Sequence, residues 1–426
     1  MKKIILAGIT FTITMTTSLP LWASGWIVKL NRTQSPQGFL RSAGLKGRVL
    51  DKRSSSRWIK LEEPAAGTVG TMSVSDLGSL PGVEYIERDQ VILISTGGSR
   101  PADPVDPVED PALGQPEVTP NDAQFSKLWG LANVNTAGST RAPHAWFHAR
   151  NRSLATVVVG VLDTGVNYNH EDLKPILYTA TLDGKSVRGI DTVRGDFVAD
   201  DEGGHGSHVS GTIAGKANNG VGVAGIAPNA RIFPMKFLGG NGKGNLSDAI
   251  EAIDQALEIG EIKVMNHSWG GGGSSRALEE AFERARARGV LMVVAASNSG
   301  KNNDTSTTYP ANIPLDNVIS VAAIDSGAKL ASFSNYGKKK VHLGAPGVNI
   351  FSSIETSPTA YDSFSGTSMA APHVTGAAAF VWGLRPEWTY QQVREHLLRN
   401  VRPLSSLKSK TSTGGTLDLY RAVRDL

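Results

Sequence analysis

Three residues of the types used in nucleophilic catalysis stand far apart in this chain of 426 residues. Asp163 follows the apolar run 157–162, so a carboxylate stands where a buried strand should end. His205 lies among small residues that would let a substrate approach an imidazole closely, and Ser368 opens an Ala-rich stretch that predicts a helix over 369–382. Backbone N–H groups at a helix N-terminus favour the negative charge that develops when a hydroxyl attacks a carbonyl carbon. A serine, a base and a carboxylate that orients the base can together act as a nucleophilic catalyst.

Taken singly, each of these residues also has a structural explanation. Asp163 could cap a helix, and Ser368 could be the N-cap of the helix that follows it. His205 and His208 have the i, i+3 spacing that two metal ligands could use, but the Glu of the H-E-x-x-H pattern is missing. We therefore expect His208 to be a structural neighbour of the site, and the catalytic hypothesis depends on the three segments together.

Buried strands that alternate with helices are predicted over the long C-terminal part of the chain. Continuous apolar runs at 157–162, 290–296 and 318–323 are typical of strands buried on both faces of a parallel sheet. Helices are predicted between Ser247, which precedes the first one, and Gly260, which stops it, then at 276–288, and after a capping box at Thr389 and Gln392. This order predicts an α/β fold with a doubly wound parallel sheet and helices on both faces. Side chains that do chemistry gather at the carboxyl ends of the strands in such a sheet.

Two further regions precede this domain, which we place at 122–426. Residues 26–95 alternate short apolar runs with polar turns and read as a small α+β domain, with strands predicted at 26–30, 83–87 and 91–94. Residues 96–121 hold several prolines and acidic residues and few apolar ones, a composition that cannot build a core. We therefore expect an extended linker there.

The surroundings of the three candidate residues resemble those of the subtilisin family of serine proteases (subtilases, peptidase family S8). The D-T-G turn at Asp163, the H-G-x-H-V segment at His205 and the seven residues from Gly366 to Pro372 match the family in its order of Asp, His and Ser. The resemblance implies a serine endopeptidase in which His205 takes the proton of Ser368 and Asp163 orients the imidazole. It also implies an acyl-enzyme that water then releases.

A fourth segment, 295–300, resembles the one that supplies a side-chain amide to the oxyanion hole of this family. The resemblance implies that Asn298 and the backbone N–H of Ser368 stabilise the oxyanion. A turn residue is the alternative for Asn298. The chain departs from the family pattern at Ser297, where Gly is usual, and at Ser207, where Thr is usual. The departure at Ser297 puts the local backbone in question.

Two glycine-rich segments resemble those that bind substrate in the family. Open backbone edges at glycines let an extended peptide add by main-chain hydrogen bonds, although a flexible loop is the alternative. The glycines also leave room for a large side chain, so we expect a bulky apolar or aromatic residue before the scissile bond. Trp269 stands where the family often has Leu and would reshape this pocket or its neighbour. The implied substrate-binding residues are Leu238, Gly239, Gly240, Gly242, Gly244, Ser268, Trp269, Gly270 and Gly271.

The loop 217–225 resembles the tight calcium-binding loop of the family, and Asp172 matches the carboxylate that completes the site. Side-chain and backbone oxygens of this kind suit Ca²⁺. The ion would be structural, because the implied catalysis needs no cofactor. A Gly/Asn turn without metal is the alternative. The implied ligands are Asp122, Asp172, Ala217, Asn219, Val221 and Val223.

Composition limits the class of protein and its location. The absence of cysteine excludes disulfides, thiolate metal sites and cysteine nucleophiles, and a net charge of +4 without a dense Lys/Arg block argues against a nucleic-acid partner. Lys2 and Lys3, the mostly apolar stretch 4–22 and the small residues 23–25 have the order of a secretory signal, which we place at 1–24. A membrane anchor is the alternative, which Pro20 and several Thr and Ser residues weaken. We expect a secreted monomer without stable membrane insertion.

Residues 26–95 resemble the propeptide of the family, most closely at 83–89. The resemblance implies that this domain assists folding and inhibits the enzyme until maturation finishes in the linker 96–121. The expected partners are therefore polypeptide substrates and the chain's own propeptide. A catalytically silent peptide-binding protein on the same scaffold is the main alternative, and the presence of all four candidate catalytic residues argues against it. An esterase would carry G-x-S-x-G, which the residues around Ser368 do not form.

Overall fold

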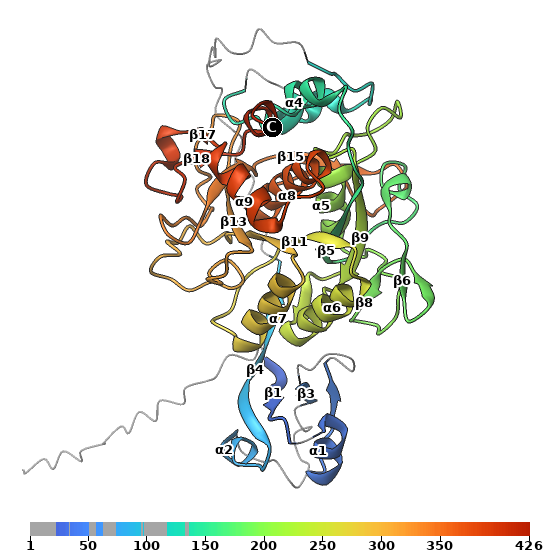
Figure 1. The fold of residues 1–426 in the computed structure, drawn as a ribbon, viewed down its shortest axis with the longest axis vertical. Coiled ribbons are helices and arrows are strands. Elements are labelled where there is room, and N and C mark those ends of the chain that lie inside the picture. The colour runs from blue at the N-terminus through green and yellow to red at the C-terminus, as the bar shows by residue number, and fades with distance from the viewer. Residues whose placement is uncertain are drawn as a thin grey trace, which may run out of the picture.

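The computed structural model describes residues 23–33, 35–50, 57–62, 74–94, 97, 117–132 and 136–426. The predicted signal at 1–24 falls almost entirely outside these residues, and so does most of the predicted linker at 96–121. The described residues form a large body, built from the C-terminal part of the chain, and a small N-terminal part that lies below it in Figure 1.

A nine-stranded sheet forms the centre of the large body, in the order β17-β18-β14-β13-β12-β11-β5-β9-β8. All of its pairs are parallel except β17 with β18 at one edge. The predicted α/β class with a parallel sheet is therefore confirmed. The strands are β5 Val157–Asp163, β8 Ile190–Asp191, β9 Ala230–Lys236, β11 Ile262–His267, β12 Leu291–Ala295, β13 Val318–Ile324, β14 Leu343–Pro346, β17 Arg402–Pro403 and β18 Gly415–Thr416.

Helices cover both faces of this sheet (Figure 1). Alternate residues of β5 belong to different cores, because successive side chains of a strand point to opposite faces. Val159 and Val161 pack in the core that contains α5 and α8, whereas Val158 and Leu162 pack in the core that contains α6 and α7. The helices are α3 Trp129–Ala132, α4 Ala142–Ala149, α5 His205–Ala214, α6 Leu246–Ile259, α7 Arg276–Ala287, α8 Thr367–Leu384, α9 Tyr390–Arg399 and α10 Leu419–Arg424.

The predicted helices begin and end within two residues of the expected positions. α6 ends where Gly260 adopts a φ of 77°, and the capping box predicted at Thr389 is present with both of its bonds. α6 begins at Leu246 rather than after Ser247. The reason is that the Ser247 N–H and hydroxyl donate to Asp89 of the N-terminal part, a partner that local sequence does not reveal.

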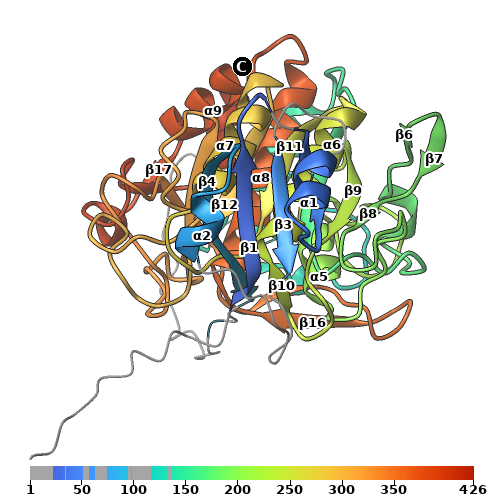
Figure 2. The ribbon, with the colours of Figure 1, turned by 90° about the horizontal axis from the view of Figure 1, so that it is seen from below.

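The N-terminal part is a small antiparallel sheet with two short helices, so the predicted α+β fold of this region is confirmed (Figure 2). The sheet order is β10-β4-β1-β3-β2, and β10 comes from the large body. One long strand, β4, unites the two strands that were predicted at 83–87 and 91–94. The elements are β1 Ala23–Leu30, α1 Pro36–Ser42, β2 Gly47–Val49, β3 Trp58–Glu62, α2 Val74–Gly78, β4 Val83–Leu93 and β10 Lys243–Asn245.

Two short antiparallel ribbons complete the described strands, β6 Ala180–Leu182 with β7 Lys185–Val187 and β15 Ile350–Ser353 with β16 Tyr361–Phe364. None of the helices in the described ranges combines the length and the apolar character needed to cross a membrane.

Candidate active site

Asp163 and His205 form a buried hydrogen-bonded pair between the end of β5 and the start of α5. His205 Nδ1 lies 2.7 Å from Asp163 Oδ1, which also accepts the Thr164 N–H at 2.8 Å. A carboxylate can only accept, so Nδ1 carries the hydrogen and Nε2 of the neutral ring is the acceptor. Within the described chain, His205 Nε2 is buried without a hydrogen-bond partner. The imidazole therefore has the orientation and the tautomer of a general base.

The two turns that carry this pair are locked together by short contacts. Thr164 Oγ1 accepts the Gly206 N–H at 2.8 Å, and a β-carbon built on Gly206 would lie only 2.2 Å from the Gly165 carbonyl oxygen. Asp201 Oδ2 accepts the Ser207 N–H in the first turn of α5. The Ser207 hydroxyl joins α5 to the segment after β5, because its Oγ accepts the Asn167 N–H. Glycine at 206 is required for this close approach.

Ser368 is the second residue of α8, and Gly366 is the N-cap. The N-cap explanation for Ser368 is therefore wrong. Its Oγ donates to the Ser268 carbonyl oxygen at 2.9 Å, and the Ser268 hydroxyl donates to the Ser368 carbonyl oxygen at 2.7 Å. Ser368 Oγ is thus bonded to Ser268 rather than to His205 in this structure. Catalytic hydrogen bonds are often long without substrate and tighten only when it binds.

Asn298 is held by the first residue of α8. Its Oδ1 accepts from the Thr367 N–H at 2.8 Å and from the Thr367 hydroxyl at 2.9 Å. These two bonds fix the amide plane, so Asn298 Nδ2 points away from Thr367. A β-carbon built on Gly366 would lie 3.3 Å from Nδ2. Ser297 keeps a left-handed backbone with a φ of 89°, and its N–H donates to Thr367 Oγ1. The departure at Ser297 therefore leaves the backbone in the conformation that glycine would adopt.

Two buried histidines are structural neighbours of these residues. His208 Nε2 lies 2.8 Å from the Ile350 carbonyl oxygen, its ring stacks on Phe364, and burial lowers its pKa to about 3. His267 packs against Trp269 and Phe282, and burial also lowers its pKa to about 3. Among the described residues, no group of three His, Cys, Asp or Glu side chains is arranged to hold a metal ion. Both rings are neutral core residues at ordinary pH.

The two predicted substrate-binding segments lie on either side of the N-terminal part's last strand. β10 pairs antiparallel with β4, with Gly244 opposite Ile92, and Gly270 forms a bridge to Leu93 on the other side. The Ile94 N–H donates to the Gly242 carbonyl oxygen at 3.0 Å. An extended segment of the chain thus occupies the position between the segments, through main-chain hydrogen bonds.

Close approach of neighbouring backbone favours glycine at two positions of these segments, whereas two larger residues face the core. A β-carbon on Gly244 would lie 2.1 Å from the Phe237 carbonyl oxygen, and one on Gly240 would lie 2.7 Å from the Glu202 carbonyl oxygen. The Leu238 side chain is buried. The Trp269 ring is only 2% exposed and packs on Phe237 with 5.0 Å between ring centroids. The Trp269 ring is thus part of the core, and its effect on the pocket or on the neighbouring one stays a prediction. The remaining predicted residues, Gly239 and Gly271, lie in the adjoining turns.

Carboxylates of the N-terminal part contact the first turns of α6 and α7. Asp89 accepts from the Ser247 N–H at 2.9 Å and from the Ser247 hydroxyl at 2.7 Å. Glu87 accepts from the Ser275 hydroxyl at 2.6 Å and from the Arg276 N–H at 3.0 Å. Negative charge is favourable at helix N-termini. The only sequence signal for this contact is the two-residue spacing of Glu87 and Asp89, which sets both on one face of β4.

The predicted calcium residues are brought together at the loop that follows α5. Asp172 Oδ1 lies 2.7 Å from Asn219 Nδ2, and Asp172 Oδ2 accepts the Val223 N–H at 2.7 Å. Asp122 accepts the N–H groups of Asn218 and Asn219 from the N-terminal end of the large body. Sequence reasoning missed Tyr361, whose hydroxyl donates to Asp172 Oδ2 at 2.8 Å.

Three backbone carbonyls of this loop complete the predicted oxygen set. In the described part of the chain, no hydrogen bond is found to the carbonyl oxygens of Ala217, Val221 or Val223. Carbonyl, carboxylate and amide oxygens are the ligands that Ca²⁺ prefers. The carboxylates and these carbonyls therefore suit such an ion, whereas Asn219 directs its amide nitrogen at Asp172 and its Oδ1 accepts the Val221 N–H.

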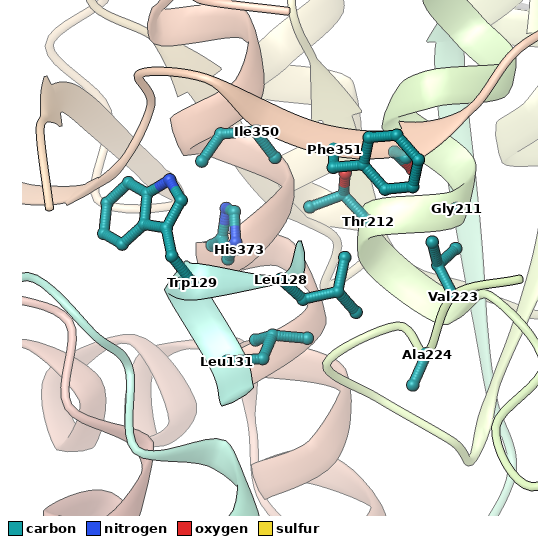
Figure 3. Close-up of a pocket in the computed structure, with 12 residues that line it drawn as sticks. Leu128, Trp129, Leu131, Gly211, Thr212, Val223, Ala224, Ile350, Phe351 and His373 are labelled. Carbon is teal, nitrogen blue, oxygen red and sulfur yellow. The ribbon is translucent and has the colours of Figure 1, made fainter. Parts of the chain in front are cut away.

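A narrow cavity lies beside Val223 and Ala224 of this loop (Figure 3). It is bounded by 128–131, by Gly211 and Thr212 of α5, and by β15, and the His373 side chain points into it. Its volume of about 20 Å³ has room for roughly one water molecule. Burial lowers the pKa of His373 to about 4, and His373 Nδ1 bonds the Met369 carbonyl. None of the candidate catalytic residues lines this cavity.

Comparison with known proteins places this geometry in a family. The model of the subtilase family (peptidase S8) matches residues 155–419. The chain is 38% identical over 331 residues to an alkaline protease of Alkalihalobacillus alcalophilus, covering 76% of this chain and 78% of that protein. It is 40% identical over 244 residues to subtilisin DY of Bacillus licheniformis, covering 57% of this chain and 82% of that protein.

A solved structure resembles the chain along most of its length. Fervidolysin from Fervidobacterium pennivorans, a keratinolytic enzyme related to subtilisin, superposes with a TM-score of 0.75 at 29% sequence identity. The match covers 95% of this chain and 61% of that one.

Proposed function

The chain belongs to the subtilase family of serine proteases, and on that premise we propose that it is a secreted serine endopeptidase made as a self-processing zymogen. The observation that carries the proposal is the buried Asp163–His205 pair, whose acceptor nitrogen Nε2 is left without a partner in the described chain. Ser368 at the start of α8 and the fixed amide of Asn298 supply the nucleophile and the oxyanion site.

The mechanism follows from these positions. In this mechanism the Ser368 hydroxyl exchanges its bond to the Ser268 carbonyl for one to His205 Nε2, which takes its proton as Oγ attacks the scissile carbonyl. Asp163 stabilises the imidazolium, and Asn298 Nδ2 with the Ser368 N–H stabilises the oxyanion. His205 then returns the proton to the leaving amine. Water, deprotonated by the same imidazole, releases the acyl-enzyme.

The N-terminal part is proposed to be the intramolecular inhibitor. Residues 91–94 pair with β10 on one side, and Leu93 bridges to Gly270 on the other, as an extended substrate would. The Gly97 N–H donates to the Ser365 carbonyl oxygen at 2.8 Å, three residues before Ser368. Ile94 and Gly97 therefore bracket the proposed first cut, and maturation is completed in the linker 96–121.

The direct test is hydrolysis of casein by protein expressed from the full-length chain and by its Ser368→Ala variant. We expect the wild type to hydrolyse casein and to lose this activity after treatment with a sulfonyl fluoride. The Ser368→Ala variant should hydrolyse none and persist as an uncut precursor after secretion. Normal processing of this variant would show that another protease makes the cut. A wild type that binds casein without cleaving it would instead support the catalytically silent alternative.

We also propose a structural Ca²⁺ held by Asp122, Asp172, Asn219 and the carbonyl groups of the loop after α5. When bound, the ion would add coordination energy to the folded state and take no part in the chemistry. Chelation should lower the melting temperature of the Ser368→Ala protein by several degrees, because a ligand at about 100 times its Kd contributes about 2.7 kcal/mol. Asp172→Ala should melt lower and should no longer respond to chelator. Equal melting temperatures with and without chelator would contradict the proposal.

A further inference from the structure

We propose that Ser297 restricts the residue before the scissile bond to small side chains, an inference that rests on the proposed peptidase function. The glycines at 270 and 271 alone suggested a roomy pocket, but they describe only one wall. Ser297 stands on the opposite wall, directly before Asn298. Its left-handed φ of 89° is a conformation that side chains rarely adopt, so this chain carries a side chain where the backbone favours none.

The position of the pocket follows from the catalytic groups. The carbonyl carbon attacked by Ser368 must lie between Ser368 Oγ and Asn298 Nδ2. The substrate residue that carries this carbonyl also carries the side chain before the scissile bond, so that side chain begins next to both catalytic groups. Ser368 Oγ contacts the Ser268 carbonyl, and Ser297 is hydrogen-bonded through its N–H to the first residue of α8. The walls of the pocket are therefore the segments 268–270 and 296–298.

The distance between these walls is short. A β-carbon built on Gly270 would lie 3.9 Å from Ser297 Cβ and 3.6 Å from the Tyr309 carbonyl oxygen. Carbon atoms in contact are about 3.5–4 Å apart, so Ser297 Cβ already reaches van der Waals contact with the space directly over Gly270. An aromatic ring or a long side chain between these walls would have to displace the Ser297 Cβ or the Tyr309 backbone. A side chain that ends close to its β-carbon extends less far between them.

The test compares peptide p-nitroanilides that differ only in the residue before the scissile bond, with Ala, Ser, Leu or Phe. Enzyme from the full-length wild-type chain should cleave the Ala and Ser substrates with a kcat/KM at least about tenfold above the Phe substrate. Ser297→Gly should raise the Phe-to-Ala ratio of kcat/KM by about tenfold or more. Ser297→Ala keeps the β-carbon and should keep the wild-type ratio, which separates the effect of the methylene from that of the hydroxyl.

Because each ratio is taken within one variant, a change in the amount of active protein does not affect it. A wild type that cleaves the Phe or Leu substrate as fast as the Ala substrate would overturn the inference, and so would an unchanged ratio in Ser297→Gly. A cleavage profile on a random peptide library checks the wild type without any variant and should show Ala, Ser or Gly before the cut. Failure of the wild type to cleave any peptide would instead overturn the proposed function.

Discussion

At the residue scale, the candidate site depends on side-chain bonds between residues that are far apart in the chain. Asp163, His205, Asn298 and Ser368 stand in sequence patterns that span only a few residues each. The bonds from Thr367 to Asn298 and between Ser268 and Ser368 join residues 69 and 100 positions apart, and no local pattern specifies such pairs. The expected preference for a bulky residue before the scissile bond stays a prediction, because it considered Gly270 without Ser297, which lies across from it.

Thr367 provides the residue-scale prediction, because its hydroxyl orients Asn298 without touching substrate. Thr367→Val keeps the shape and loses the bonds of Oγ1 to Asn298 and to the Ser297 N–H. We expect kcat to fall about tenfold with little change in KM, against about 10²–10³ for Asn298→Ala, which removes the donor itself.

Steady-state kinetics on one Ala peptide p-nitroanilide would measure both parameters. Thr367→Ser retains the hydroxyl and should recover most of kcat, which a purely structural role of the methyl group would not allow. If Thr367→Val has the kcat of the wild type, Asn298 is held by the Thr367 N–H alone.

At the scale of elements, the ends of strands and the first turns of helices hold the candidate catalytic side chains in place. β5 ends on Asp163, α5 begins on His205, and α8 carries Ser368 in its first turn. The apolar runs and helical patterns predicted these elements to within two residues, because burial on both sheet faces and capping are local signals. The contact of Asp89 and Glu87 with α6 and α7 could not be predicted from local sequence, since their partners are 158 to 190 residues away.

The element-scale prediction concerns the caps that join the N-terminal part to α6. Asp89 is fully buried with Lys60 Nζ at 3.2 Å, and it accepts two bonds from Ser247. Asp89→Ala in the Ser368→Ala precursor should weaken the docking by roughly 1–3 kcal/mol, typical of lost bonds to a buried charged group. Hydrogen exchange at the amides of β10 should then accelerate about tenfold or more.

Glu62→Ala is the matched control, because this carboxylate is on the same part of the chain and its residue is exposed. It should leave the exchange of β10 unchanged. Equal exchange in the Asp89→Ala and Glu62→Ala proteins would mean that main-chain pairing alone holds β4 in place.

At the scale of the whole molecule, the stability of the fold depends on core packing, on the proposed Ca²⁺, or on both, since the chain has no cysteine and so no disulfides. Apolar side chains fill a core on each face of the nine-stranded sheet, and His208, His267 and His373 are buried, whereas His342 is half-buried. Burial lowers the pKa of His208, His267 and His342 to about 3 and that of His373 to about 4. The composition predicted a sizeable core, but which histidines are enclosed depends on how the helices cover the sheet.

These histidines predict loss of stability in mild acid. The unfolded chain binds protons at histidine near pH 6.5, whereas the folded chain does so only near pH 3 to 4. Stability is therefore full above pH 6.5 and falls as the pH drops toward the folded values, by about 1.4 kcal/mol per pH unit for each such group. Buried carboxylates with raised pKa, such as Asp418, act in the opposite direction at lower pH.

Urea unfolding of the Ser368→Ala protein at pH 7.5, 6.0 and 5.0 would measure this slope. His267→Leu is a suitable comparison, because both His267 ring nitrogens lack partners within the described chain. In this variant the loss of unfolding free energy per pH unit should be smaller by about 1.4 kcal/mol, the contribution of one histidine. A midpoint that stays constant between pH 7.5 and 5.0 would show that the buried histidines are not retained as neutral groups.

The central claim is that Ser368 is a nucleophile activated by His205, and covalent labelling tests it most directly. A fluorophosphonate should modify the enzyme produced from the full-length chain at one site, and mass spectrometry of its peptides should locate the adduct on Ser368. His205→Ala should lose the label, because the hydroxyl then has no base. Labelling at Ser365 or Ser207 instead, or equal labelling of Ser368 in the His205→Ala protein, would contradict the account.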